Sequence, residues 1–327
     1  AGVYSSMKSG ADVLVENYGV PEGALEEAVA FFPMITSPDT VILGKLGKLD
    51  SHGLSQMTFL LLYIVNPCII IQCFQVEATP ALLRELGTGA LVTLACYAAY
   101  ILIAQLLFRR TARDDRDSLR FAVVYGNIGF MGVPLVQSIL GADAMIYGAL
   151  SLVAFNLFSW THGVILMGGR KALSPRKVFL NPGVIGLAIA LVFFLGHFTL
   201  PAPIGNAVSF LADLNSPLAM VVVGAQMASA GLLRSFRRPV LYAASAVRLV
   251  VIPALTALCL LPLGLNPALY CASVILSAAP VAGITSMFAQ QFGRNTETAV
   301  QMITLSTLLS IVTLPVFAAL AKSLSGF

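Results

Sequence analysis

The stretch "YGNIGFMGVPL", residues 125–135, lies in the middle of an apolar run that is long enough to cross a bilayer. It contains three glycines, one asparagine and one proline, and glycine and proline both weaken a helix. Lipid offers no water to repair broken backbone hydrogen bonds, so a break is tolerated only inside protein or beside a wet cavity. The stretch therefore predicts a membrane helix that is interrupted for a functional reason.

The composition places the whole chain in a membrane. Of 327 residues, 58% are hydrophobic and 10% are charged, and the mean hydropathy is +0.88. Soluble domains carry about 25% charged residues, and a membrane helix needs about 20 consecutive apolar residues. The five cysteines lie in apolar runs and match no zinc or redox spacing, so we interpret them as packing residues.

Apolar runs and charged breaks predict ten membrane spans and their orientation. The first is weak, because Pro33, Pro38 and Asp39 interrupt it. Fifteen of the 19 Lys and Arg residues follow odd-numbered spans, whereas Arg84 alone follows an even-numbered one. Positive loops stay in the cytosol, so we expect a multi-pass protein of the plasma (inner) membrane with both termini extracytoplasmic. The expected spans are residues 28–46, 54–75, 87–108, 119–141, 145–168, 183–200, 206–232, 239–263, 267–291 and 297–321.

The two halves of the chain repeat one layout. Span two carries Asn66 before Pro67 and span seven carries Asn215 before Pro217, while spans four and nine carry Pro134 and Pro280. A unit of five spans reverses direction when it is repeated, and such inverted repeats are typical of secondary transporters whose sites lie between discontinuous helices. We therefore expect an all-α membrane protein with a 5+5 inverted repeat, whose fourth and ninth helices cross at Pro134 and Pro280. The expected division is a polar extracytoplasmic segment at 1–27, repeats at 28–168 and 183–327, and a basic cytoplasmic loop at 169–182.

Several motifs resemble the auxin efflux carrier family, whose bacterial members include malate and malonate carriers. They are "ILGKLGKLDSHGLSQMTFLLLYIVNPCII", "GNIGFMGVPL", "SAAPVAGITSMFAQQFGRNTETA" and "STLLSIVTLPVF", and the resemblance covers about residues 42–325. It implies a ten-span inverted repeat related to that of bile-acid sodium symporters. It also implies that Asn127, Pro134 and Pro280 lie at the crossing and contact a substrate carboxylate.

Ten residues are candidates for binding the substrate. Asn127 either binds it or bonds to loose backbone at the break, and Asn66 and Asn215 either line the pocket or hold their own proline-kinked turns together. Arg248 lies deep in span eight, where a charge is a functional hypothesis. Its long side chain could instead snorkel toward the cytoplasmic end. The full set is Asn66, Asn127, Gly129, Gly132, Pro134, Gln137, Asn215, Arg248, Ser277 and Pro280.

Two titratable residues are candidates for carrying a coupling ion. Asp213 either carries a proton or caps span seven, and His162 either titrates near neutral pH or is satisfied by a neighbouring helix. The loop "RRTARDDRDSLR" at 109–120 is interpreted as a solvated anchor and not a nucleic-acid site, because its three aspartates nearly balance its arginines.

The pattern favours a secondary transporter that moves a small organic anion by alternating access. The expected substrate is a carboxylate or dicarboxylate such as malate, malonate or an auxin-like acid, and the alternative is a sodium-coupled symporter of the bile-acid type. The sequence shows no paired intramembrane aspartates, Ser–His arrangement or zinc motif of an enzyme. No cofactor is expected beyond a coupling proton or sodium ion, and the expected partners are membrane lipid and a second copy in a homodimer. The coupling ion, direction and oligomeric state stay open.

Overall fold

The computed structural model describes residues 51–215, 217–218, 221–222 and 238–326, and this part of the chain is helical. Within it there is no β-strand, and the extended backbone pairs at one isolated bridge between Gly126 and Val281. The expected polar segment at 1–27, the expected first span at 28–46 and most of the second half of span seven lie outside the described residues.

The helices follow one another through short connections. In chain order they are α4 (Ser51–Leu60), α5 (Asn66–Cys73), α6 (Pro80–Leu107), α7 (Arg113–Val124), α8 (Val133–Leu140), α9 (Met145–Phe158), α10 (Val164–Gly168), α11 (Pro175–Phe179), α12 (Pro182–Leu195), α13 (Ala202–Asp213), α16 (Pro239–Ala246), α17 (Ile252–Leu260), α18 (Pro267–Ser277), α19 (Ile284–Gln291) and α20 (Thr296–Ser325). Four π-helical turns, η1 (Leu61–Val65), η2 (Ile128–Gly132), η4 (Ser159–Gly163) and η6 (Val247–Val251), and the 3₁₀ turns η3 (Ala142–Ala144), η5 (Arg170–Ala172) and η7 (Leu261–Leu263) join some of them.

Five helical segments of the described chain are long and apolar enough to cross a membrane. They are His52–Cys73, Pro80–Leu107, Ala142–Gly168, Pro239–Leu263 and Thr296–Ser325, and they correspond to the spans expected at 54–75, 87–108, 145–168, 239–263 and 297–321. Three shorter apolar helices, Ile128–Leu140, Pro182–Leu195 and Pro267–Ser277, lie within other expected spans.

Three of the π-helical turns each end two residues before a proline. The turns η1, η2 and η6 precede Pro67, Pro134 and Pro253. A proline ring collides with the carbonyl four residues earlier, and the wider π turn relieves that collision without breaking the helix. Proline inside an apolar run of this protein is therefore compatible with a continuous helix.

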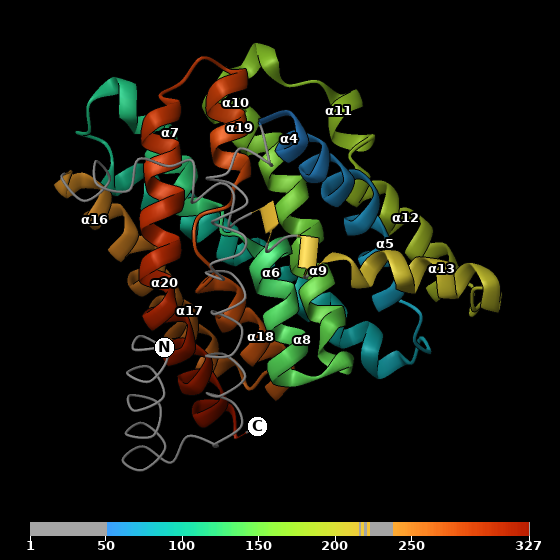
Figure 1. The fold of residues 1–327 in the computed structure, drawn as a ribbon. Helices are drawn as coiled ribbons and strands as arrows, with labels where there is room; N and C mark the ends of the chain where they lie inside the picture. The colour runs from blue at the N-terminus through green and yellow to red at the C-terminus, as the bar shows by residue number, and fades with distance from the viewer. Residues whose placement is uncertain (1–50, 216, 219–220, 223–237, 327) are drawn as a thin grey trace, which may run out of the picture.

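The helices form two groups with α9 between them. The side bundle consists of α4, α5, α12 and α13, in which α5 packs against both α12 and α13. The crossover bundle consists of α6, α7, α8, α16, α17, α18, α19 and α20, and α9 packs against members of both groups. In Figure 1 the side bundle is on the right, and α16, α17 and α20 are on the left. A boundary between two helix groups is a place where one group can move against the other.

The start of α7 is tied to neighbouring helices. Asp115 forms an ion pair with Arg238, and it accepts hydrogen bonds from Asn295 Nδ2 at 2.7 Å and Thr298 Oγ1 at 2.6 Å. Asp117 lies 3.5 Å from Arg294 Nη1. The interpretation of the 109–120 loop as a solvated anchor is therefore wrong for its two later aspartates, because both side chains are mostly buried and paired.

Candidate binding site at a helix crossing

Two interrupted helices meet through their extended backbones. Helix α7 ends at Val124 and the chain becomes helical again at Ile128, while the helical course between α18 and α19 breaks over residues 278–283. The two extended segments run antiparallel. Asn127 N donates to the Pro280 carbonyl at 2.6 Å, and Ala282 N donates to the Tyr125 carbonyl at 3.0 Å. These hydrogen bonds satisfy backbone groups that would have no partner in lipid.

The first break does not occur at the expected proline. Pro134 is the second residue of α8 and continues a helix that has already started, whereas the crossing lies at Gly126 and Asn127. The expected position was wrong because the π turn before Pro134 absorbs the proline, and the extended backbone forms where a partner segment pairs with it. Pro280 does lie at the second interruption, where its carbonyl accepts the bond from Asn127.

The crossing brings four helix ends together. The C-terminal ends of α7 and α18 present carbonyls that have no partner within their helices, and the helices that begin at Ile128 and Ile284 present their N-terminal ends. Ile128 N and Thr285 N at these starts donate to the nearby carbonyls of Gly126 and Ala282. Each end carries about half an elementary charge, negative at the C-terminus and positive at the N-terminus. A crossing of this kind therefore needs a cation on one pair of ends and favours an anion at the other.

Arg248 provides the cation for the C-terminal pair. Its Nε donates to the Ala279 carbonyl at 2.9 Å, and its Nη1 donates to the carbonyls of Val123 and Val124 at 3.2 and 3.3 Å. The side chain is 1% exposed. Arg248 thus does not snorkel to the surface, and its described hydrogen bonds are to backbone at the crossing.

The N-terminal pair faces a cavity of about 620 Å³. Asn127, Gly129 and Phe130 line it from one interrupted helix, and Ala282, Gly283 and Ile284 line it from the other. The Asn127 Oδ1 accepts from Phe130 N at 3.3 Å, so this side chain caps the helix that follows it. Asn127 therefore caps this helix and also lines the cavity. Its two expected roles, bonding to backbone at the break and binding the substrate, are compatible with each other.

The remaining wall is polar and aromatic. Among the residues that the structure describes, no charged side chain lines this cavity. Two of its amides are incompletely bonded, because Asn66 Oδ1 and Asn181 Nδ2 are buried without a hydrogen-bond partner. The amide and aromatic side chains of the wall are Phe59, Tyr63, Asn66, Asn127, Phe130, Phe155, Asn156, Trp160, Asn181 and Gln290. Such a wall can bind a polar group through amides and an apolar body through rings.

The repeated asparagines Asn66 and Asn215 converge on one glycine. Asn215 Nδ2 donates to the Gly129 carbonyl at 2.9 Å, and a Cβ at Gly129 would lie 3.7 Å from both amide atoms of Asn66. The Gly129 carbonyl is five residues before Pro134, which has no N–H to donate to it in a π-helical register. Asn215 therefore repairs a carbonyl that the proline leaves free, and Asn66 lines the cavity.

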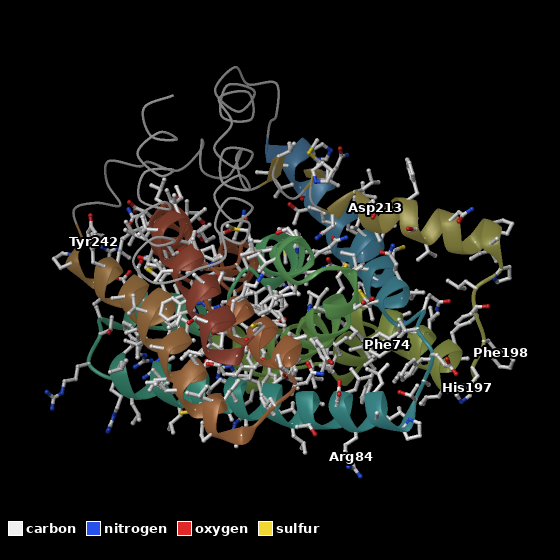
Figure 2. All side chains as sticks on the ribbon, turned by 90° about the horizontal axis from the view of Figure 1, so that it is seen from below. Phe74, Arg84, His197, Phe198, Asp213 and Tyr242 are labelled. Atoms are coloured by element: carbon white, nitrogen blue, oxygen red, sulfur yellow. The ribbon has the colours of Figure 1, made fainter. Side chains whose placement is uncertain are left out.

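The other candidates lie elsewhere. Gly132 is buried at the end of η2, and a Cβ there would come 2.7 Å from Leu276 Cδ2, so it permits close packing of this turn on α18. Gln137 is exposed, and Ser277 donates to the Val274 carbonyl. Asp213, labelled in Figure 2, is the last residue of α13, and its side chain is exposed. None of these four lines the large cavity.

His162 reaches the crossing indirectly. Its Nδ1 lies 2.9 Å from the hydroxyl of Tyr125, and the backbone carbonyl of Tyr125 takes part in the antiparallel pairing. The histidine lies in the π-helical turn η4, a local geometry that is frequent at functional sites.

Sequence reasoning missed Asn181 as a cavity residue. It precedes α12, and its Oδ1 accepts from Gly183 N at 2.8 Å, as an N-cap does. The order Asn-Pro-Gly at 181–183 was a readable helix start, but no local pattern indicates that this start faces a cavity.

A helical protein whose long apolar segments surround a crossing of two interrupted helices belongs to the class of membrane transporters. The sequence model of the family described as "Membrane transport protein" matches residues 42–174 and 171–318. The chain belongs to this family, which includes the auxin efflux carriers. It is not an enzyme but a transporter.

The curated relatives bear transporter names. A protein named "Putative malonate transporter" from Rhizobium meliloti is 27% identical over 296 residues, which is 84% of this chain and 90% of that protein. An "Uncharacterized transporter" from Methanothermobacter thermautotrophicus is 24% identical over 84% of this chain and 91% of its own length. "Auxin efflux carrier component 3" of Arabidopsis thaliana is 31% identical over 121 residues, or 36% of this chain and 19% of that protein.

Proposed function

We propose that this transporter is a secondary carrier that moves a small organic anion with a carboxylate group by alternating access. The carboxylate binds at the crossing, against Asn127 and the positive N-terminal ends of the helices that begin at Ile128 and Ile284. One observation carries this proposal: the two helix N-termini face the cavity, whereas carbonyls at the two C-terminal ends already accept hydrogen bonds from Arg248.

The wall of the cavity suits reversible binding of an anion. Helix N-termini attract negative charge through aligned N–H groups, and the described wall adds amides but no cationic side chain. A carboxylate held without an ion pair is released more readily, which a carrier requires in each cycle. The relative named as a malonate transporter supports a carboxylate, so malonate, malate and an auxin-like acid are the substrates to test.

Movement would occur at the boundary between the side bundle and the crossover bundle. The cavity lies at this boundary, with α4 and α5 on one side and the crossing on the other. It extends from Asn127 to Thr296 at the start of α20 and Ser55 near the start of α4. In the proposed ten-span inverted repeat, with both termini outside the plasma membrane, that end faces the cytosol, and rocking of one bundle would open the opposite side.

A proton or a sodium ion is the proposed coupling ion. His162 is the better placed of the two candidates, because Tyr125 links it to the crossing, whereas Asp213 is exposed at the end of α13. Uptake into proteoliposomes under imposed proton, sodium or voltage gradients identifies the ion.

The same preparation, measured with chemical crosslinking, tests the proposed homodimer.

The central test uses the single tryptophan of the chain, Trp160, which lines the cavity. Titration with malonate or malate should change its fluorescence, and labelled malonate, malate or indole-3-acetate should accumulate in proteoliposomes. Asn127→Ala should weaken binding by about 10- to 150-fold, the cost of losing a hydrogen bond to a charged group.

Asn266→Ala is the matched control for this test. Asn266 also caps a helix, since its Oδ1 accepts from Ala268 N at 2.9 Å, but it does not line the cavity. Its variant should keep the wild-type affinity. The proposal is wrong if no carboxylate binds or is transported, or if both variants bind as the wild type does.

A further inference from the structure

We infer that Arg248 is a tethered cation that takes the place of a mobile metal cation at the crossing and positions the anion site on the other side. It neutralises the C-terminal ends of α7 and α18, and it thereby holds the two extended segments in the register that places Asn127 on the cavity. The inference rests on the proposed function for the identity of the bound anion. Its consequence is that this place in the protein needs no sodium ion.

The hydrogen bonds of Arg248 are those of a cation site built from backbone. Three carbonyls surround the guanidinium, from Val123 and Val124 of one interrupted helix and from Ala279 after the other. Carbonyls freed by helix breaks are the ligands that bind sodium in transporters. The ion pairs described for the chain include none between Arg248 and a carboxylate.

The charges balance without a further ion. Two helix C-termini together carry about one negative elementary charge, and one guanidinium carries one positive charge. Removing the guanidinium would leave two uncompensated helix ends in the membrane interior, where an unpaired charge is costly. A second cation beside Arg248 would be repelled by it, so the carbonyls are closed to sodium while Arg248 is present.

Gly126 provides the space for this arrangement. A Cβ at position 126 would overlap the Nη2 and Cζ atoms of Arg248 and lie 3.1 Å from the Ala279 carbonyl oxygen. Because Gly126 is itself the bridge residue paired with Val281, any side chain here would displace the guanidinium from the crossing. The glycine is therefore needed for close approach and not for a special backbone angle.

A small cavity beside Arg248 makes the inference testable by chemical rescue. Its volume is about 30 Å³, and Tyr97, Ser277 and Arg248 contribute to its wall. The Tyr97 hydroxyl is buried without a hydrogen-bond partner. In Arg248→Ala the vacated side-chain volume adjoins this small cavity, so a methylguanidinium ion can occupy the combined space.

The experiment compares wild type and Arg248→Ala in detergent, with and without millimolar methylguanidinium or sodium. Two readouts are taken: thermal unfolding and the malonate affinity from Trp160 fluorescence. Arg248→Ala should lose about 10-fold or more in affinity, and methylguanidinium should restore both the affinity and the unfolding temperature. Methylguanidinium should change neither readout in the wild type. Arg84→Ala, which removes an exposed arginine that points away from the molecule in Figure 2, should match the wild type throughout.

A second variant covers the case in which Arg248→Ala does not fold. Gly126→Ala keeps the charge but displaces it, so it should lower affinity without any rescue by methylguanidinium. Wild-type affinity and unfolding temperature in Gly126→Ala overturn the inference, as does an Arg248→Ala protein that folds and neither loses affinity nor responds to methylguanidinium. If the wild type binds no carboxylate, the proposed function fails, and the cation response of unfolding still decides the role of Arg248.

Discussion

The two sides of the helix crossing have the same origin and opposite properties. On one side the C-terminal ends of α7 and α18 meet a buried arginine that bonds to their carbonyls. On the other side the helix starts at Ile128 and Ile284 face a cavity whose described wall carries no charge. A crossing always creates both pairs of ends. The protein therefore completes one pair with its own side chain and leaves the other pair for a ligand.

Helix α7 shows the same rule along a single element. Asp115 and Asp117 lie in its first turns, where negative charge complements the positive end of the helix dipole, and Arg248 meets its last carbonyls. Both ends of α7 are thus compensated within the protein. The helix that starts at Ile128 has Asn127 as a neutral cap, which leaves its dipole available to an anion.

The largest effect, on carboxylate affinity, should come from filling the cavity at the N-terminal ends of the two interrupted helices. Gly129→Leu would push a side chain into the space between Leu152 and Asn66, since a Cβ already lies 3.3 Å from Leu152 Cδ1. The leucine would occupy cavity space that the carboxylate needs, so carboxylate affinity should fall by about 100-fold. Trp160 fluorescence measures it. Gly87→Leu, at an exposed helical glycine with no atom within 4 Å of its Cβ position, is the control, and equal affinities in both variants would show that the cavity is not the site.

A smaller effect, on stability, should follow from removing the hydrogen bond that Asn215, two residues after the end of α13, makes at the crossing. Asn215→Ala leaves the Gly129 carbonyl without its 2.9 Å donor. An unsatisfied buried acceptor costs about 1–3 kcal/mol, so the unfolding temperature should fall. An unchanged unfolding temperature would mean that this hydrogen bond does not stabilise the crossing beside the cavity.

Removing the ion pair between Asp115 and Arg238 at the start of α7 should have a smaller effect on stability. Asp115→Asn removes the ion pair with Arg238 but keeps a side chain that can accept hydrogen bonds. The pair is partly exposed, with 34% of the Arg238 side chain accessible, so the loss should be about 1 kcal/mol of unfolding free energy. Thermal unfolding checks it, with the exposed Asp143→Asn as control. Carboxylate affinity should stay at the wild-type value. A large loss of affinity would mean that this ion pair also determines the geometry of the crossing.

The smallest effect is expected at Pro134, although the sequence motif points to it. Pro134→Ala adds an N–H in a helix that already accommodates position 134, so affinity should change by less than about 3-fold. The new N–H can also bond to the Gly129 carbonyl. The cost of Asn215→Ala should therefore shrink in the Pro134→Ala background, and a double-mutant cycle measures this. Strict additivity would contradict the idea that Asn215 replaces the missing proline donor.

Much of the fold was predictable because it depends on the solvent. Hydropathy alone indicates five long spans that the structure contains, and the glycines before Pro134 indicate an interruption in the fourth. Asn66 and Asn215, singled out as a repeated pair, do converge on Gly129. The place of the break was not predictable, because a proline motif reports where a helix is weak and not where another backbone pairs with it.

The membrane class, the long apolar helices and the weak points within them follow from the sequence by itself, since each depends on short-range preferences and on burial in lipid. The tertiary structure decided that the crossing lies at Gly126 and Asn127, that Arg248 bonds to helix ends 31 and 125 residues away along the chain, and that Asn181 lines the cavity. These are contacts between distant segments, and their energies depend on which backbone groups remain unpaired once all the helices have packed together.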